Sequence, residues 1–173
     1  MSDIVDMCKR EKELTLDFQL NIDKWDNVNQ EIKNIVSDGW KEIKFLDEDG
    51  ISVNQDIVKV PDDMGGVYVF LLKPNIIPDM HMYIMYIGRA RRKKEFSLRK
   101  RCREYLKDTR PKIAYMREMW GKDLYFYYLP LENDEIIERV ERELNRVIIP
   151  PCNSQIPDQY VTIMPDTSAF KEG

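Results

Sequence analysis

Histidine and cysteine are scarce in this chain. Its 173 residues contain one histidine, His81, and three cysteines, Cys8, Cys102 and Cys152, which lie far apart. An odd number of distant cysteines is typical of reduced thiols and does not suit a disulfide framework or a zinc knuckle. We therefore expect the cysteines to be small buried hydrophobic residues.

Long apolar runs are also missing. No stretch of about 18 apolar residues occurs, so the sequence predicts no membrane span. The first residues, MSDIVDMCKREKE, lack the apolar centre of a signal peptide. With 43% apolar and 34% charged residues, the composition is typical of a globular domain, and we expect a cytoplasmic protein without a membrane partner.

Positive charge is in overall deficit but is concentrated in one segment. The net charge is −4, yet residues 89–103 hold nine Lys or Arg and a single acidic residue, Glu95. Such asymmetry predicts a local anion-binding surface. The alternative is a basic helix face that contacts only solvent.

The pattern of the chain changes near residue 61. We interpret residues 1–60 as a mainly helical N-terminal accessory region, with amphipathic stretches at 3–18 and 27–40. Residues 61–153 form the main domain. Residues 154–173 form a polar, proline-punctuated tail that we expect on the surface.

Three short segments rich in aromatic and β-branched residues predict strands, at 67–72, 82–88 and 123–131. A loop of nine residues joins the first two, which favours an antiparallel pair. Helices are predicted at 97–108, with Ser97 as N-cap, at 111–120, and in the segment NDEIIERVERELNRVII, which the prolines at 150 and 151 follow.

Two tyrosines on the first two strands are candidates for a site. Tyr68 and Tyr86 can share one face of the antiparallel pair, either as core aromatics or as part of a site. Gly66 and Gly88 lie beside them and would leave the backbone open to a bulky ligand.

Charged candidates lie on two of the predicted helices. Glu141 falls at the edge of the apolar stripe of the last helix, where a carboxylate needs an ion-pair partner or a metal. On this spacing Arg142 faces away. Arg101 and Tyr105, spaced i and i+4, share an edge of the earlier helix. The two tyrosines, Arg101 and Glu141 could therefore converge.

In order and spacing, these residues resemble the GIY-YIG endonucleases. GVY at 66–68 and YIG at 86–88 are similar to the two tripeptides that name the family. LRKRCREYL is similar to its arginine-bearing helix, and ERELNRVIIPPCN to its segment with a glutamate twelve residues before an asparagine, here Glu141 and Asn153. The resemblance covers residues 64–153. It implies an α+β fold with a small three-stranded antiparallel sheet flanked by helices.

The resemblance also implies a chemistry, hydrolysis of a phosphodiester with one divalent cation. Glu141 would bind Mg²⁺ or Mn²⁺, Tyr68 would contact the attacking water as its base, and Arg101 would bind the scissile phosphate. Tyr86 and Tyr105 would position water and phosphate, and Asn153 would tie its loop to the site. The basic residues that we expect to contact DNA are Arg89, Arg91, Arg92, Lys93, Lys94, Arg99, Lys100 and Arg103.

The resulting hypothesis is a metal-dependent DNA endonuclease of restriction type or of phage or mobile-element type. We expect it to act as a homodimer on DNA, because one chain carries one site. The alternative is a non-catalytic nucleic-acid-binding or regulatory module on the same fold. Other nuclease classes fit poorly: His81 alone cannot supply an HNH site, and no acidic residue after Pro61 has a lysine two positions later, as a PD-(D/E)xK site requires.

Overall fold

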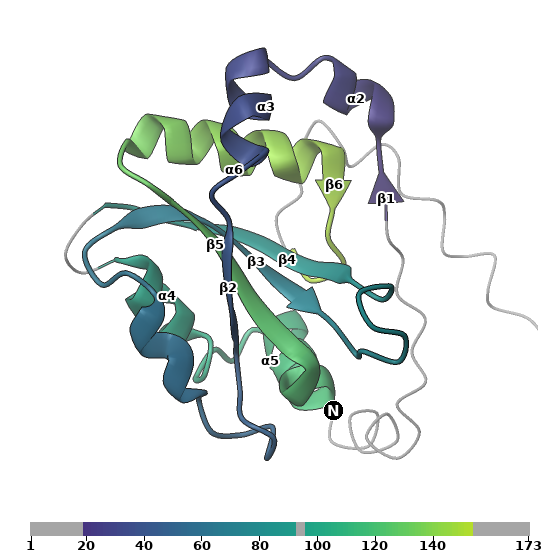
Figure 1. Cartoon of the computed structure of the whole chain (residues 1–173), viewed down its shortest axis with the longest axis vertical. Coiled ribbons are helices and arrows are strands. Elements are labelled where there is room, and N and C mark those ends of the chain that lie inside the picture. Colours follow the sequence, from purple (N-terminus) through teal and green to yellow (C-terminus); the bar gives the residue numbers. More distant parts are fainter. Residues whose placement is uncertain (1–18, 93–95, 154–173) are drawn as a thin grey trace, which may run out of the picture.

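The computed structural model describes residues 19–92 and 96–153 (Figure 1). Thirteen short elements follow one another in this part of the chain. In order they are β1 (Gln19–Leu20), α2 (Ile22–Asp26), α3 (Gln30–Val36), β2 (Lys41–Lys44), η1 (Gln55–Lys59), β3 (Gly65–Leu72), β4 (Tyr83–Ala90), α4 (Leu98–Glu104), α5 (Pro111–Trp120), η2 (Gly121–Asp123), β5 (Leu124–Leu131), α6 (Asp134–Val147) and β6 (Ile148–Ile149).

An antiparallel sheet with the strand order β2-β5-β3-β4 forms the centre of an α+β fold. The three strands predicted from the sequence are confirmed as β3, β4 and β5. The prediction of a three-stranded sheet is wrong, because β2 pairs with the outer edge of β5 and makes a fourth strand. β2 has the sequence KEIK, in which only Ile43 is buried, so it lacks the apolar alternation that marks a strand.

A second, two-stranded sheet joins β1 to β6. The sequence suggested that Ile148 and Ile149 continue the last helix, but α6 ends at Val147 and the two isoleucines pair with Leu20 and Gln19. This pairing ties the beginning of the described chain to the end of α6.

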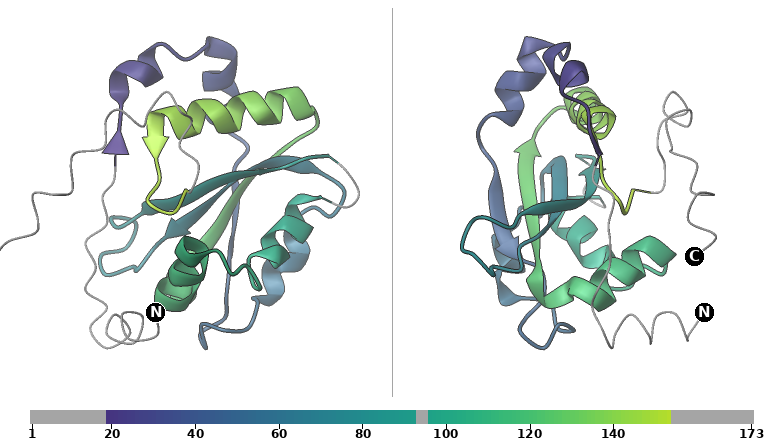
Figure 2. Two further views of the ribbon diagram at one scale, coloured as in Figure 1. Left: turned by 180° about the vertical axis from the view of Figure 1, so that it is seen from behind. Right: turned by 90° about the vertical axis from the view of Figure 1, so that its right-hand side faces the viewer.

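Side chains of β3 alternate between two hydrophobic cores, one on each face of the sheet. Val67 and Val69 pack with α6 and with Ile32 of α3. Tyr68, Phe70 and Leu72 face the other way, into the core that α4 and α5 cover. Figures 1 and 2 show α6 on one face of the sheet and α4 and α5 on the opposite face. The described part of the N-terminal region contributes to both cores, through Val28 and Ile32 on one face and Ile43, Phe45, Leu46 and Ile57 on the other.

The helix starts follow local rules. Ser97 caps α4 as predicted, with its Oγ accepting a hydrogen bond from the Lys100 amide, and Asn133 caps α6. α5 begins with Pro111, as the fixed φ of proline favours. In place of a helix over 27–40 the chain forms α3 over seven residues, followed by β2. The amphipathic stretch at 3–18, Cys8 and the tail at 154–173 lie outside the described residues.

Two expectations from composition concern the cysteines and membrane-spanning helices. Cys102 and Cys152 are free and buried, as expected of small apolar residues. Among the described helices, none combines the length and apolar character needed to cross a bilayer.

Candidate active site

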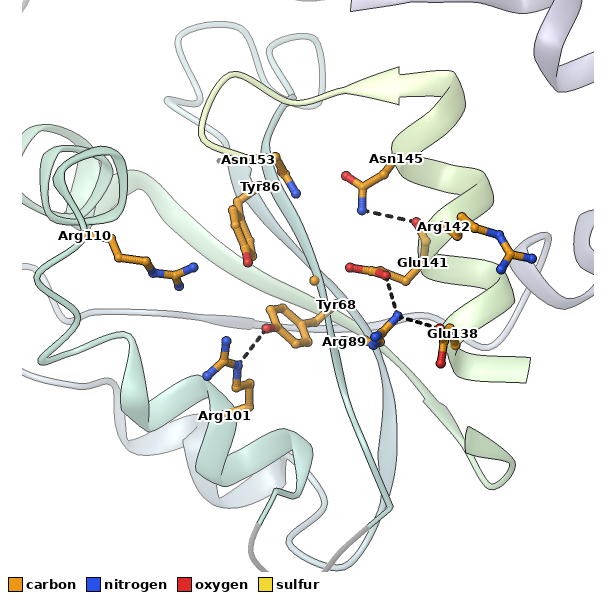
Figure 3. Close-up of a pocket in the computed structure, with 11 residues that line it drawn as sticks. Tyr68, Tyr86, Arg89, Arg101, Arg110, Glu138, Glu141, Arg142, Asn145 and Asn153 are labelled. Carbon is orange, nitrogen blue, oxygen red and sulfur yellow. Dashed lines mark hydrogen bonds and ion pairs between the residues drawn. The ribbon is translucent and has the colours of Figure 1, made fainter. Parts of the chain in front are cut away.

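An open cleft of about 610 Å³ lies beside the edge strand β4, between α6 on one side and α4 with the start of α5 on the other (Figure 3). Its wall is formed by β3, β4, α4, α6, the start of α5 and the segment after β6. The lining residues are Tyr68, Tyr86, Gly88, Arg89, Arg101, Arg110, Glu138, Glu141, Arg142, Asn145 and Asn153.

A cluster of three tyrosines forms the floor of the cleft. The Tyr68 and Tyr86 rings stack with centroids 6.4 Å apart, although Tyr68 pairs in register with Gly88 rather than with Tyr86. The hydroxyl groups of Tyr68 and Tyr105 are 2.8 Å apart and share a hydrogen bond. Nε of Arg101 donates a second hydrogen bond to the Tyr68 hydroxyl at 3.1 Å. The i, i+4 spacing of Arg101 and Tyr105 therefore brings both side chains to Tyr68.

Burial keeps these phenols protonated. Tyr68 is fully buried and Tyr105 is 1% exposed. In each case loss of hydration is the largest influence and raises the pKa well above its ordinary value, while the nearby Arg101 charge opposes that rise only in part. At neutral pH both hydroxyl groups keep their protons. Tyr86 is 8% exposed, and its hydroxyl points towards the open centre of the cleft (Figure 3).

The two glycines beside the tyrosines are required by close packing. A Cβ on Gly88 would lie 2.5 Å from the Tyr68 Oη and 2.8 Å from Cε1 of Tyr86. A Cβ on Gly66 would lie 2.2 Å from the backbone oxygen of Leu129. The expectation that both glycines leave the backbone open to a ligand is therefore wrong for Gly66, where β5 occupies the space. Gly88 does line the cleft, but the absence of a side chain there also makes room for the Tyr68 ring.

Glu141 of α6 and Arg89 of β4 form an ion pair at the edge of the cleft. Nη1 of Arg89 lies 3.0 Å from Oε2 of Glu141 and 3.9 Å from Oε1 of Glu138. Partial burial is the main influence on the Glu141 carboxyl and raises its pKa, and the positive charge of Arg89 acts in the opposite direction. The ion pair that the sequence left open as an alternative is thus present.

The chemistry of Glu141 is compatible with a magnesium-type ion. Within residues 19–92 and 96–153, no three His, Cys, Asp or Glu side chains are grouped as metal ligands. Mg²⁺, however, is commonly bound by one or two carboxylates with water and substrate phosphate as its other ligands. Glu141 offers such a carboxylate, and the hydrogen bond from Arg89 uses only its Oε2. Because this carboxylate is partly buried, pairing with a cation offsets part of its lost hydration.

Asn153 fixes the segment after β6 to β4. Its Nδ2 donates to the backbone oxygen of Ile87 at 2.8 Å, and its Oδ1 accepts from the Ile87 amide at 2.9 Å. The Cys152 amide adds a hydrogen bond to the Met85 oxygen at 3.0 Å. The side-chain amide thus pairs with the strand backbone and closes one end of the cleft.

Four cleft residues were missed from the sequence. Glu138, Arg142 and Asn145 lie on α6 around Glu141 and line the cleft. Arg142 is nevertheless exposed and its guanidinium points outwards, as predicted (Figure 3). Spacing from Glu141 by three or four positions could have indicated Glu138 and Asn145. Arg110 precedes α5, and its guanidinium lies 5.9 Å from the centre of the Tyr86 ring and 5.8 Å from that of Tyr105. Asp108 holds it through hydrogen bonds from Nε and Nη2 at 3.0 and 2.6 Å.

The predicted DNA-contacting residues are distributed over several places. Arg89 lines the cleft, and Arg91 lies with Phe96 in a smaller neighbouring hollow that also includes Arg101. Arg92 and Arg103 are exposed, Lys100 is partly buried on α4, and Lys93 and Lys94 lie outside the described residues. Arg99 points elsewhere: it donates to the backbone oxygens of Val58 and Val60, at 2.7 Å each.

Comparisons with family models, with curated proteins and with solved structures found no match to this chain. The site is an open cleft with arginines on both walls, a buried tyrosine cluster below and one half-buried carboxylate at its edge.

Proposed function

We propose that this chain is a divalent-metal-dependent DNA endonuclease that resembles the GIY-YIG family. The observation that supports this best is that the side chains of the sequence motif meet at one cleft. Tyr68, Tyr86, Arg101, Glu141 and Asn153 come from five separate segments, and all five line one cleft. Structural packing alone does not require the residues of a sequence motif to meet at an opening.

The cleft has the charge pattern that a phosphodiester needs. Arg101 and Arg110 approach it from the side of α4 and α5, and Arg89 from the side of α6 (Figure 3). Guanidinium groups bind phosphate oxygens in bidentate fashion and offset negative charge that develops during hydrolysis. Arg101 is oriented by Tyr68 and by an ion pair with Glu104, so it reaches the cleft in a fixed position.

Glu141 is the residue that would bind the metal. A bound Mg²⁺ or Mn²⁺ would act as a Lewis acid on the phosphate and lower the pKa of a coordinated water. The Tyr68 hydroxyl accepts a hydrogen bond from Nε of Arg101 and shares another with the Tyr105 hydroxyl, so we assign it the orientation of Arg101. Tyr86, whose hydroxyl faces the cleft, is better placed to contact the nucleophilic water.

A cleavage assay with matched variants tests this function. Supercoiled plasmid is incubated with purified protein, with and without Mg²⁺, and nicked and linear products are measured. Glu141→Gln should reduce the cleavage rate by at least about a thousandfold, roughly 4 kcal/mol of barrier, while DNA binding persists. Glu135→Gln, on an exposed position of the same helix, is the control and should cut at the parent rate.

Arg101→Ala should lower the rate by a similar factor, because it removes the cation that faces the transition state. The losses from Arg101→Ala and Glu141→Gln should not add, since both groups act on one phosphate. Cleavage by folded Glu141→Gln near the parent rate would remove both the metal assignment and the proposed family resemblance of the site.

The alternative function is a binding module without turnover, and the Arg89–Glu141 ion pair favours it, because this carboxylate already has a cationic partner. Under that alternative, the protein binds DNA with the expected salt dependence but produces no nicks at any Mg²⁺ or Mn²⁺ concentration. If cleavage occurs, sequencing of the cut ends distinguishes a restriction-type enzyme, with a fixed motif, from one directed by structure.

A further inference from the structure

The loop between β3 and β4 exposes four large apolar side chains. The exposed fractions are 77% for Ile76, 53% for Ile77, 72% for Met80 and 51% for Met82. The loop has internal turns, with positive φ at Asn75 and Asp79, and a hydrogen bond from the Met80 amide to the Ile77 oxygen. Single exposed apolar residues are common, but a cluster of this kind marks an interaction surface.

An apolar cavity of about 620 Å³ begins at the base of the same loop. It lies between the sheet and α2 and α3, on the face opposite the tyrosine cluster. Its walls include Trp25, Trp40, Ile84, Tyr127, Leu144 and Ile148, and Trp40 stacks on Tyr127 with ring centroids 5.1 Å apart. Lys73 and Met82, at the two ends of the loop, belong to its lining. A protruding apolar segment and an apolar hollow are therefore adjacent on one surface.

We propose that this surface binds a second copy of the chain, with the β3–β4 loop of each protomer inserted into the cavity of its partner. A two-fold axis places a patch against an identical patch, so a surface that carries both a knob and a hole beside each other is complementary to itself. The loop extends away from the body on the side of α2 and α3 (Figure 2, right), which allows it to reach across such an axis.

The size and polarity of the surface fit this occupant. Covering the four exposed side chains in both copies removes roughly 1,000 Å² of accessible surface from water, and the cavity walls add to this area. The total approaches the lower limit for specific protein–protein interfaces. At one side of the rim, Lys73 and Glu42 form an ion pair at 3.1 Å, so the apolar centre has a polar border there. The cavity and the arginine-lined cleft share no residue, so dimer formation leaves both clefts open.

Sedimentation of the full chain without DNA, over a range of about 1 to 100 µM, tests the proposal. We expect a monomer–dimer equilibrium. Ile77→Asp, in the loop, and Ile84→Arg, in the cavity wall, should each weaken dimer formation at least tenfold. Ile51→Asp, at an apolar position that is 81% exposed elsewhere, is the matched control and should leave it unchanged. Thermal unfolding checks that every variant is folded.

Mixing the two variants gives the sharper result. In a dimer of one Ile77→Asp chain and one Ile84→Arg chain, one loop–cavity contact is intact and the other places the introduced carboxylate against the introduced guanidinium. The mixture should therefore dimerise more tightly than either variant alone. If the parent chain stays monomeric through the whole concentration range, the proposal is wrong, even if a different protein is later found to bind in the cavity. Unchanged dimer formation by Ile77→Asp, or a mixture that dimerises no more tightly than its components, would also contradict it.

Discussion

Replacing Gly88 by alanine is the most direct perturbation of the tyrosine cluster. The new Cβ would lie 2.5 Å from Oη and 2.7 Å from Cζ of Tyr68, and ordinary contact begins near 3.4 Å. The Tyr68 ring would have to retreat by about 1 Å into a core where the Phe126 ring is already stacked at 5.1 Å. Tyr86 closes the other side, with its Cε1 only 2.8 Å from the new atom.

The cost follows from two contributions. Overpacking a filled core costs about 1–3 kcal/mol. A displaced Tyr68 also loses or weakens its hydrogen bonds to Tyr105 and Arg101, each with a net value of about 1 kcal/mol. We therefore expect Gly88→Ala to lower the free energy of unfolding by about 3 kcal/mol, or the midpoint of thermal unfolding by about 10 °C for a chain of this size.

Urea unfolding, followed by far-UV and near-UV circular dichroism, measures this loss. Gly50→Ala is the control: its φ is +68°, but the nearest atom to a new Cβ is 3.8 Å away. It should cost about 1 kcal/mol through backbone conformation alone and leave the near-UV tyrosine signal unchanged. If Gly88→Ala were as stable as the parent with the same tyrosine signal, the packing explanation of this glycine would be wrong.

Two further predictions concern DNA. Replacing Arg91, Arg92, Lys93 and Lys94 by alanine should weaken binding to DNA of any sequence, without affecting the cleavage rate at saturating protein. The slope of log affinity against log salt concentration should become flatter by about 0.9 per lost phosphate contact. The control, Arg99→Ala, should leave that slope unchanged and reduce stability in urea, because it removes two hydrogen bonds to backbone oxygens. Arg110→Ala should lower cleavage at least tenfold by removing a cleft cation, whereas Arg139→Ala, whose guanidinium pairs with Glu31 at 3.3 Å, should not.

The central strands could be predicted because their sequences carry a strong local signal. β3 is GGVYVFLL, buried along its whole length, and β5 holds six aromatic or apolar residues in a row before Pro130. β2 carries only one buried side chain, and it forms a strand because it pairs with β5. Its own sequence therefore carries too little signal to predict it. The length of α6 was overestimated for a related reason, since Ile148 suits a helix as well as a strand and only its partner Leu20 decides.

The same contrast applies to the site. Residues within a spaced motif, such as Tyr68 and Glu141, could be located in one cleft from the sequence. Arg110 could not, because the residue before Pro111 carries no periodicity that would place it over the Tyr86 and Tyr105 rings. The packing role of Gly88 could not be predicted either, since the ring that fills the space of its missing side chain comes from a neighbouring strand.

The Arg89–Glu141 ion pair leads to a last prediction, on the order in which ligands bind. A cation at Glu141 must compete with the Arg89 guanidinium, which lies 3.0 Å from Oε2. Arg89→Ala removes that competitor and leaves a half-buried carboxylate without its partner, so Mn²⁺ affinity in the absence of DNA should rise, by about tenfold if the pair is worth about 1.4 kcal/mol.

DNA should have the same effect on the parent protein, because a phosphate that engages Arg89 frees Glu141. By reciprocity, Mn²⁺ should then strengthen DNA binding in the parent and do so less in Arg89→Ala. Electron paramagnetic resonance of free Mn²⁺ measures the metal affinity independently of cleavage, with Glu141→Gln as the variant that should lose it. If Arg89→Ala bound Mn²⁺ no more tightly than the parent, the ion pair would not compete with metal binding. If Glu141→Gln kept the parent affinity for Mn²⁺, Glu141 would not be the metal ligand.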